Sequence, residues 1–153
     1  MTAQAIEPRY DRSPGASHAH LQDLLRYMVP LGRALFAAIF VLSAVGHFSS
    51  KEIGYAAQHG VPFASVLVPL SGVLALAGGL SVLLGYKARI GAWMLVAFLL
   101  PVTLAMHSFW AETDPAAAMM QQVMFMKNVS MLGAALMITY LGAGPVSLDS
   151  RHP

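Results

Sequence analysis

Among the polar side chains that interrupt the apolar stretches of this sequence are His47, His107, Lys127 and Asn128. Imidazole titrates near neutral pH and both donates and accepts hydrogen bonds, whereas the lysine ammonium donates them and the asparagine amide does both. If the fold brings these groups together, they can bind the two oxygens of a quinone head group, and a histidine can exchange protons with it. We therefore interpret the four residues as a candidate pocket for a quinone or a similar ligand.

Other interpretations of these residues remain open. Two histidines from separate helices can ligate a haem iron or another metal, although no third ligand and no i, i+3 or i, i+4 ligand pair accompanies them. Lys127 can instead extend its ammonium to lipid headgroups, and both histidines can bond to backbone groups or water. The sequence contains no evident cofactor motif, and a haem fits the pattern less well than a quinone does.

The composition indicates what surrounds these residues. Of the 153 residues, 57% are hydrophobic and 10% are charged, whereas a typical soluble domain is about 25% charged. So few charges cannot cover a water-soluble surface, and we expect the lipid bilayer to cover much of the chain. The net charge of +2 comes from scattered basic residues, which disfavours a nucleic-acid partner. The absence of cysteine excludes disulfides and thiol redox chemistry.

Long uncharged stretches predict four membrane-spanning helices, near residues 28–48, 64–85, 90–110 and 119–141. Each is long enough to cross a bilayer, which takes about 20 residues, and none has the charged face of a soluble helix. The prediction is an all-α, integral membrane four-helix bundle over residues 26–150, after a flexible cytoplasmic arm of residues 1–25. A short interfacial helix is expected between the first two spans, in "SSKEIGYAAQHGVP", which begins with a serine cap and ends near a glycine.

Basic residues are unevenly divided between the two sides of the predicted bundle. One side has Arg9, Arg12, Arg26, Arg33, Lys87, Arg89 and Arg151, and the other has Lys51, Glu112 and Asp114. The positive-inside rule therefore predicts that both termini are cytoplasmic and that the candidate pocket lies in the outer leaflet. Arg33 and Asp149 come to the inner side, where we predict a structural ion pair, because desolvated arginines bind carboxylates.

Five segments occur in an order and at spacings typical of a known family: "LGRALFAAIFVLSAVGHF", "LSGVLALAGGLSVLLGYKARIGA", "MHSFW", "FMKNVSMLGAAL" and "GAGPVSLD". On these segments, over about residues 28–150, the chain resembles the DoxX family of small bacterial four-helix membrane proteins, especially its YqjF-like members. The resemblance implies a multi-pass protein of the bacterial inner membrane. It also implies polar positions at Arg33, His47, His107, Lys127, Asn128 and Asp149. Some members of that family are linked to quinone-dependent electron transfer.

Three functions agree with these expectations. The first is a quinone-interacting or redox-linked membrane subunit, at most a component of a membrane oxidoreductase, with the outer-leaflet pocket as its site. The alternative is a non-catalytic accessory subunit that stabilises a larger membrane or respiratory complex. A third is an ion or small-molecule pathway along the helix face that joins Arg33 to His47.

Overall fold

The computed structural model describes residue 21 and residues 23–151, and the regular structure within them is entirely helical. The α-helices are α2 (Met28–Ser43), α3 (Ser50–Gln58), α4 (Ala64–Leu84), α5 (Ala88–Met106) and α6 (Pro115–Leu141). Short 3₁₀ helices extend or follow them: η1 (Ala44–Phe48), η2 (Phe109–Ala111) and η3 (Asp149–Arg151). The predicted all-α fold is confirmed. The predicted arm, residues 1–25, falls mostly outside the described residues.

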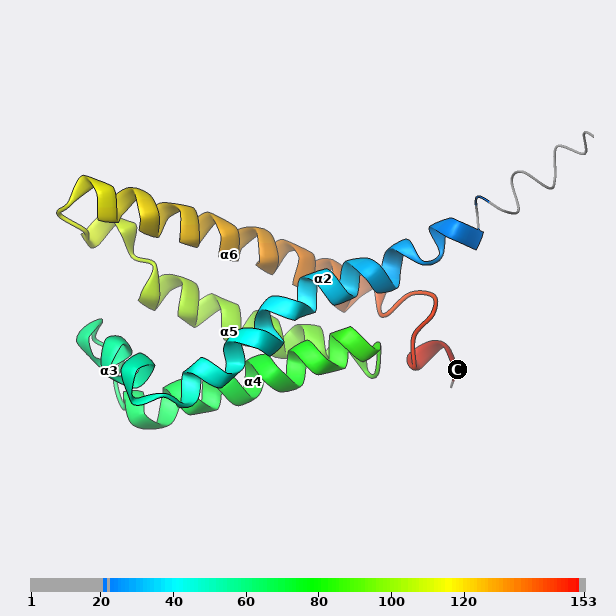
Figure 1. Ribbon diagram of the computed structural model, residues 1–153, viewed down its shortest axis with the longest axis horizontal. Coiled ribbons are helices and arrows are strands. Elements are labelled where there is room, and N and C mark those ends of the chain that lie inside the picture. The colour runs from blue at the N-terminus through cyan, green and yellow to red at the C-terminus, as the bar shows by residue number, and fades with distance from the viewer. Residues whose placement is uncertain (1–20, 22, 152–153) are drawn as a thin grey trace, which may run out of the picture.

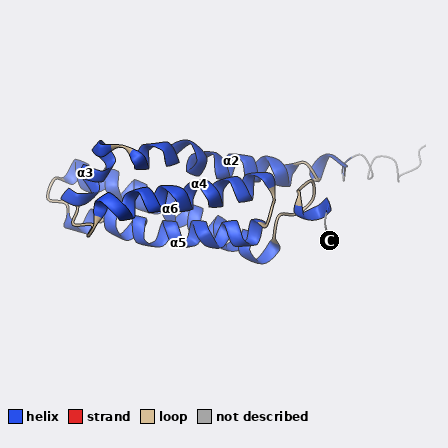
Figure 2. Ribbon diagram, turned by 90° about the horizontal axis from the view of Figure 1, so that it is seen from below, coloured by secondary structure: helices blue, strands red, loops and turns tan. Residues whose placement is uncertain are grey.

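Four helical segments in the described part of the chain are long and apolar enough to cross a membrane: Asp23–Phe48, Ala64–Leu84, Ala88–Ala111 and Pro115–Leu141. They run lengthwise beside one another, as Figure 2 shows. The prediction of four spans is therefore confirmed. The helix of the last span begins at Pro115, before the span predicted near residues 119–141, and Asp114 Oδ2 caps it by accepting a hydrogen bond from Ala117 N at 2.8 Å.

The two ends of the bundle differ in their polar residues. The end with His47, α3 and the connection from α5 to α6 is called here the histidine end. The end with Arg33, the turn from α4 to α5 and the C-terminal segment (residues 142–151) is called the arginine end (Figure 1). The assignment of the arginine end to the cytoplasm remains a prediction from the positive-inside rule.

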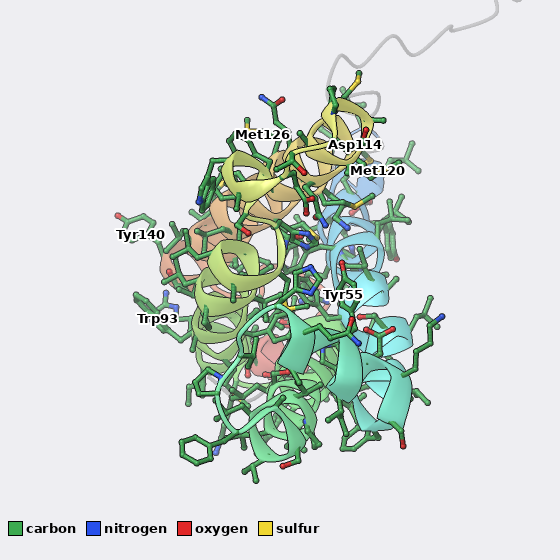
Figure 3. All side chains as sticks on the ribbon, turned by 90° about the vertical axis from the view of Figure 1, so that its left-hand side faces the viewer. Tyr55, Trp93, Asp114, Met120, Met126 and Tyr140 are labelled. Atoms are coloured by element: carbon green, nitrogen blue, oxygen red, sulfur yellow. The ribbon has the colours of Figure 1, made fainter. Side chains whose placement is uncertain are left out.

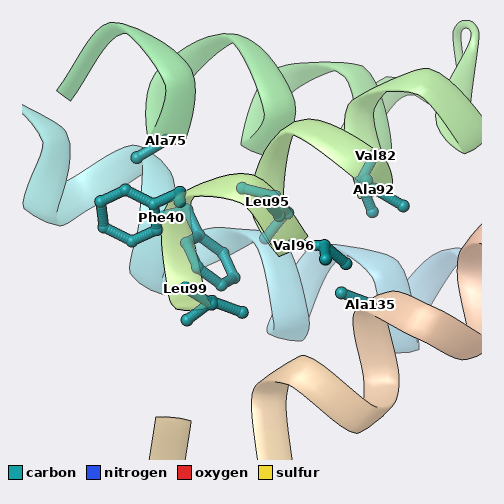
Figure 4. Packing of buried hydrophobic residues seen from close by; sticks show 10 residues of the cluster. Phe40, Ala75, Val82, Ala92, Leu95, Val96, Leu99 and Ala135 are labelled. Carbon is teal, nitrogen blue, oxygen red and sulfur yellow. The ribbon is translucent and has the colours of Figure 1, made fainter. Parts of the chain in front are cut away.

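The helices pack in the order α2, α4, α5, α6, so α4 and α5 lie in the middle of the bundle. Small residues let α4 and α5 approach closely, since a Cβ on Gly78 would lie 2.8 Å from the Gly91 carbonyl oxygen. Such close approach maximises van der Waals contact, which drives helix association in lipid. The largest fully buried side chains join α2, α4 and α5 in one core (Figure 4): Phe40, Val82, Leu95 and Leu99.

Helix α3 is the predicted short helix between the first two spans. Ser49 Oγ accepts a hydrogen bond from Glu52 N at 3.2 Å and caps its first turn. The chain leaves the helix through Gly60, whose φ of 78° is a left-handed conformation that glycine adopts without steric cost. Ala56 is the buried residue of α3, and the helix packs against α4 and η1. It therefore covers the histidine end, beside the candidate site.

Candidate functional site

A largely apolar cavity of about 430 Å³ lies at the histidine end, between the halves of α4 and α5 nearest that end and beside α3. Most of its wall consists of aliphatic residues of α4 and α5, with Phe98 and Met106. Five polar side chains also line it: His47, Glu52, Tyr55, Ser71 and His107. Figure 3 looks onto this end and shows Tyr55 toward the middle of the bundle, whereas Trp93 and Tyr140 project at its periphery. The cavity thus combines an apolar wall with a small group of polar side chains, as ligand sites commonly do.

His47 is held in place by contacts with both middle helices. It lies in η1, where Nδ1 is 3.2 Å from the Ser43 carbonyl oxygen. Its ring packs against Phe98 of α5, with 5.7 Å between ring centroids. On α4, a Cβ at Gly72 would lie only 2.7 Å from His47 Cβ, so the absence of a side chain at position 72 allows this contact. Because a carbonyl oxygen only accepts hydrogen bonds, Nδ1 must carry the proton, and Nε2 of the neutral ring is an acceptor.

His107 follows the last residue of α5, and its half-buried ring links α5 to α6. Nδ1 lies 2.9 Å from Gln121 Oε1 of α6. With the amide oxygen as acceptor, Nδ1 again donates and Nε2 of the neutral ring can accept a hydrogen bond. A cluster of three aromatic rings supports this connection: Phe109, Trp110 and Phe125 lie with centroids 5.1 to 5.8 Å apart. The two histidines therefore line one cavity, each with the same ring nitrogen engaged by an oxygen.

Lys127 and Asn128 belong to α6, which contributes no residue to the cavity wall. Lys127 is exposed, and its Nζ lies 3.5 Å from Met124 Sδ one turn earlier. Asn128 is 5% exposed and lies on the face of α6 that packs against α5, together with Gln121 and Ala135, seven residues before and after it. Adjacent residues of a helix differ by about 100° in direction. With Asn128 turned inward, Lys127 points away from the bundle, and of the four predicted residues only the two histidines line the cavity.

Three polar residues of the cavity were not among the predicted ones. Glu52 and Tyr55 lie one turn apart on α3, and an amphipathic helix placed at the end of the bundle is the signal that could have identified them. Ser71 donates its hydroxyl hydrogen to the Val68 carbonyl at 2.7 Å and is thereby satisfied within α4. His59 bonds to the Tyr55 carbonyl at 2.9 Å and does not line the cavity. No group of three or more His, Cys, Asp or Glu side chains in the described residues could hold a metal ion.

Arg33 and Asp149 both lie at the arginine end, as expected, but they do not bind each other. The buried Arg33 guanidinium donates hydrogen bonds to the carbonyl oxygens of Ala143, at 2.6 Å, and Val146, at 2.8 Å. Asp149 accepts from the backbone amides of Lys87, at 2.7 Å, and Ala88, at 3.1 Å. Among residues 23–151 the one salt bridge joins Arg26 and Asp23.

The correction to the predicted ion pair has a physical reason in the backbone. The first amides of α5 have no partners within the helix, and a carboxylate satisfies them and complements the helix dipole. The carbonyl oxygens of the C-terminal segment similarly satisfy the arginine. Arg33 therefore binds the backbone of the C-terminal segment, and Asp149 binds the backbone at the start of α5. The two side chains form no direct ion pair.

Comparison with known proteins agrees with this architecture. The model of the SURF4 family matches residues 18–152. The chain is 31% identical over 127 residues to the inner membrane protein YqjF of Escherichia coli (strain K12), covering 79% of this chain and 88% of that protein. It is 28% identical over 99 residues to the inner membrane protein YphA of the same organism, covering 65% and 70%. No solved structure matches the chain. With its four spans, the chain is a multi-pass protein of the bacterial inner membrane.

Proposed function

The chain belongs to the SURF4 family, and we propose that it binds a quinol, the reduced form of a membrane quinone, in the cavity at the histidine end. One observation carries the proposal: two imidazoles line a single apolar cavity, and each has Nδ1 bonded to an oxygen. Their Nε2 atoms can then accept hydrogen bonds from the two hydroxyl groups of a quinol. A neutral imidazole in this tautomer offers no donor to the carbonyl oxygens of the oxidised quinone, so the reduced form is favoured.

The wall of the cavity suits the rest of such a molecule. Leu67 and Leu70 line it from α4 and are 41% and 52% exposed, and Pro101 lines it from α5. Their exposed surfaces face the region where lipid surrounds the bundle, so an isoprenoid tail can enter sideways between α4 and α5. Because the tail comes from lipid and not from water, aliphatic side chains hold it by van der Waals packing, as they do a neighbouring helix. The apolar wall and the two acceptors together define a ligand with a long tail and a hydroxylated ring.

Glu52 and Tyr55 extend the polar part of the cavity toward the surface of the bundle. Both also line a shallow depression on the outer side of α3, so these side chains separate the cavity from the aqueous phase. The residues suit binding of a quinol and acceptance of its protons, whereas electron transfer requires a partner. Under this proposal the chain is at most the quinol-binding component of a membrane oxidoreductase.

A non-catalytic accessory subunit is the second candidate, and α6 favours it. Only 11% of the most apolar stretch of α6 is buried within the bundle, compared with 39% of that of α5, and Lys127 is exposed. Such a face can contact a helix of a larger membrane or respiratory complex. Protein that retains no quinol or quinone, but copurifies in a fixed ratio with a larger enzyme, supports this second function.

The test measures binding of a short-chain quinol, and of its oxidised quinone, to the purified protein in lipid nanodiscs. We expect the quinol to bind more tightly than the quinone. His47→Ala and His107→Ala should each weaken quinol binding about three- to tenfold, since a hydrogen bond contributes about 0.5–1.5 kcal/mol. Extraction of the purified protein, followed by mass spectrometry, identifies any quinone that it retains from the membrane.

Two matched variants serve as controls. His59→Ala removes an imidazole at the same end, and Lys127→Ala removes the predicted residue that lies outside the cavity. Both should bind the quinol as the natural protein does. The proposal fails if neither cavity histidine affects binding, or if Lys127→Ala weakens it as much as His107→Ala.

A further inference from the structure

A second cavity, of about 460 Å³, lies at the arginine end between the start of α5 and the C-terminal segment. Lys87 and Arg89 contribute cationic side chains to it, and Ile90 and Leu141 contribute aliphatic ones. We propose that this cavity binds the phosphodiester headgroup of an anionic phospholipid, with Lys87 and Arg89 as its cationic partners. The inference does not depend on the quinol site, which lies at the opposite end of the bundle.

The cavity exists because hydrogen bonds hold the C-terminal segment against the arginine end of the helices. Leu148 N and Asp149 N donate hydrogen bonds to the carbonyl oxygens of Leu84, at 3.3 Å, and Gly85, at 2.8 Å. Arg33 holds the same segment nearer to α6, through the carbonyl oxygens described above. A segment bound at both ends forms a fixed wall opposite Lys87 and Arg89. The site is therefore built by the fold, and a lipid does not need to order it.

The two cations have no acidic partner within the described residues. Asp149 is the carboxylate in the cavity wall, and its two oxygens accept hydrogen bonds from the backbone amides of Lys87 and Ala88. Lys87 Nζ lies over the ring of Tyr86, 5.5 Å from its centroid. The Arg89 guanidinium forms no hydrogen bond or salt bridge with residues 23–151. With the carboxylate engaged by backbone amides, the cavity presents two positive side chains that have no acidic partner among residues 23–151.

The other polar groups of the wall are satisfied by one another. Ser147 Oγ donates to the Gly144 carbonyl at 2.8 Å, and Ser150 Oγ donates to the Ser147 carbonyl at 2.7 Å. Gly142 lets the guanidinium of Arg89 lie against the backbone, because a Cβ there would be 3.3 Å from Arg89 Nε. The donors that remain for a ligand are thus the cationic ones, and arginine binds phosphate oxygens in a bidentate geometry.

The aliphatic part of the wall favours a lipid over a soluble phosphate. Ile90 and Leu141 are 59% and 65% exposed, and both lie at the ends of membrane spans. They line the cavity beside the cations, where the headgroup and acyl regions of a leaflet meet. An anionic phospholipid such as phosphatidylglycerol places a phosphodiester and its acyl chains in this arrangement. Inorganic phosphate would use the cations alone.

Native mass spectrometry of the full chain, released from nanodiscs that contain both phosphatidylglycerol and phosphatidylcholine, tests the inference. The natural protein should retain phosphatidylglycerol in preference to phosphatidylcholine. Arg89→Gln and Lys87→Asn should each reduce that preference about fivefold, because a basic side chain near an anionic membrane surface contributes on the order of 1 kcal/mol. Asparagine suits position 87, whose φ of 47° is left-handed.

Arg151→Gln is the matched control, since it removes one charge at the same end without altering the wall of the cavity. It should keep the full preference. The inference is overturned if the natural protein shows no preference, or if Arg151→Gln reduces it as much as Arg89→Gln does. Inorganic phosphate is added in a separate series. If it displaces the bound phosphatidylglycerol at millimolar concentration, the site is a phosphate site and the assignment to a lipid is wrong.

Discussion

Replacing Gly72 by alanine tests how His47 is held at the cavity. A Cβ at position 72 would lie 2.7 Å from His47 Cβ and 3.3 Å from the Ala44 carbonyl oxygen. Favourable carbon–carbon contacts are about 3.5–4.0 Å long, so η1 must move away from α4 by about 1 Å. We expect the imidazole to leave its position against Phe98 and to bind the quinol less tightly.

Two opposing contributions determine the change in the free energy of unfolding. Overpacking a close contact costs about 1–3 kcal/mol, whereas alanine in place of glycine within a helix stabilises by about 1 kcal/mol. The expected net result for Gly72→Ala is a loss of about 0–2 kcal/mol. Gly133→Ala is the matched control on α6, because a Cβ there would meet nothing within 4 Å. It should show the helix stabilisation alone.

Equilibrium unfolding in mixed detergent micelles measures the stability of these variants, and two backgrounds identify the atom responsible. His47→Ala keeps the Cβ that the new side chain would strike, whereas His47→Gly removes it. Gly72→Ala should therefore cost much less in the His47→Gly background than in the His47→Ala background. Equal costs in both would show that His47 Cβ is not displaced, and the account of how this histidine is positioned would be refuted.

Three other outcomes test the remaining parts of the structure. Arg33→Ala should accelerate hydrogen exchange at residues 143–149, because it removes hydrogen bonds to two of their carbonyl oxygens; unchanged exchange would contradict this role. Asp149→Ala should lower the free energy of unfolding by about 1 kcal/mol through loss of the α5 cap, while Asp149→Asn should lose less, as thermal unfolding can measure. Since the sequence lacks cysteine, Gln58→Cys and Arg151→Cys report orientation. An impermeant thiol reagent should label intact cells at position 58 only, and the opposite pattern would reverse the predicted topology.

The membrane spans could be predicted from the sequence because the bilayer imposes a length and excludes charge. The direction of each side chain around a span could not. In water, a charged face marks the outside of a helix, but in α6 both faces are mainly apolar with a few polar residues, and only packing distinguishes them. The neighbours Lys127 and Asn128 show the consequence, since one is exposed and the other is buried against α5.

For the candidate site, the sequence predicted at which end of the bundle each histidine lies. Opposite directions of successive spans bring His47 and His107 to one end, and the structure has them in one cavity wall. Glu52 and Tyr55 were not found, because their place depends on how α3 folds over that end. The hydrogen-bond partners of Arg33 and Asp149 also could not be predicted from the sequence. Side-chain charge suggests an ion pair, whereas the backbone groups that both residues bind leave no pattern in the sequence.

The hydrogen bonds of Arg33 determine when, during synthesis of the chain, the first span can complete its packing. The Ala143 carbonyl oxygen is 110 positions away in the chain, and that of Val146 is 113 positions away. The guanidinium therefore has neither partner until the three later spans have been synthesised. The first span cannot reach its final environment before then. Closure of the bundle at the arginine end must therefore follow synthesis of the C-terminal segment, whatever the order in which the four spans enter the membrane.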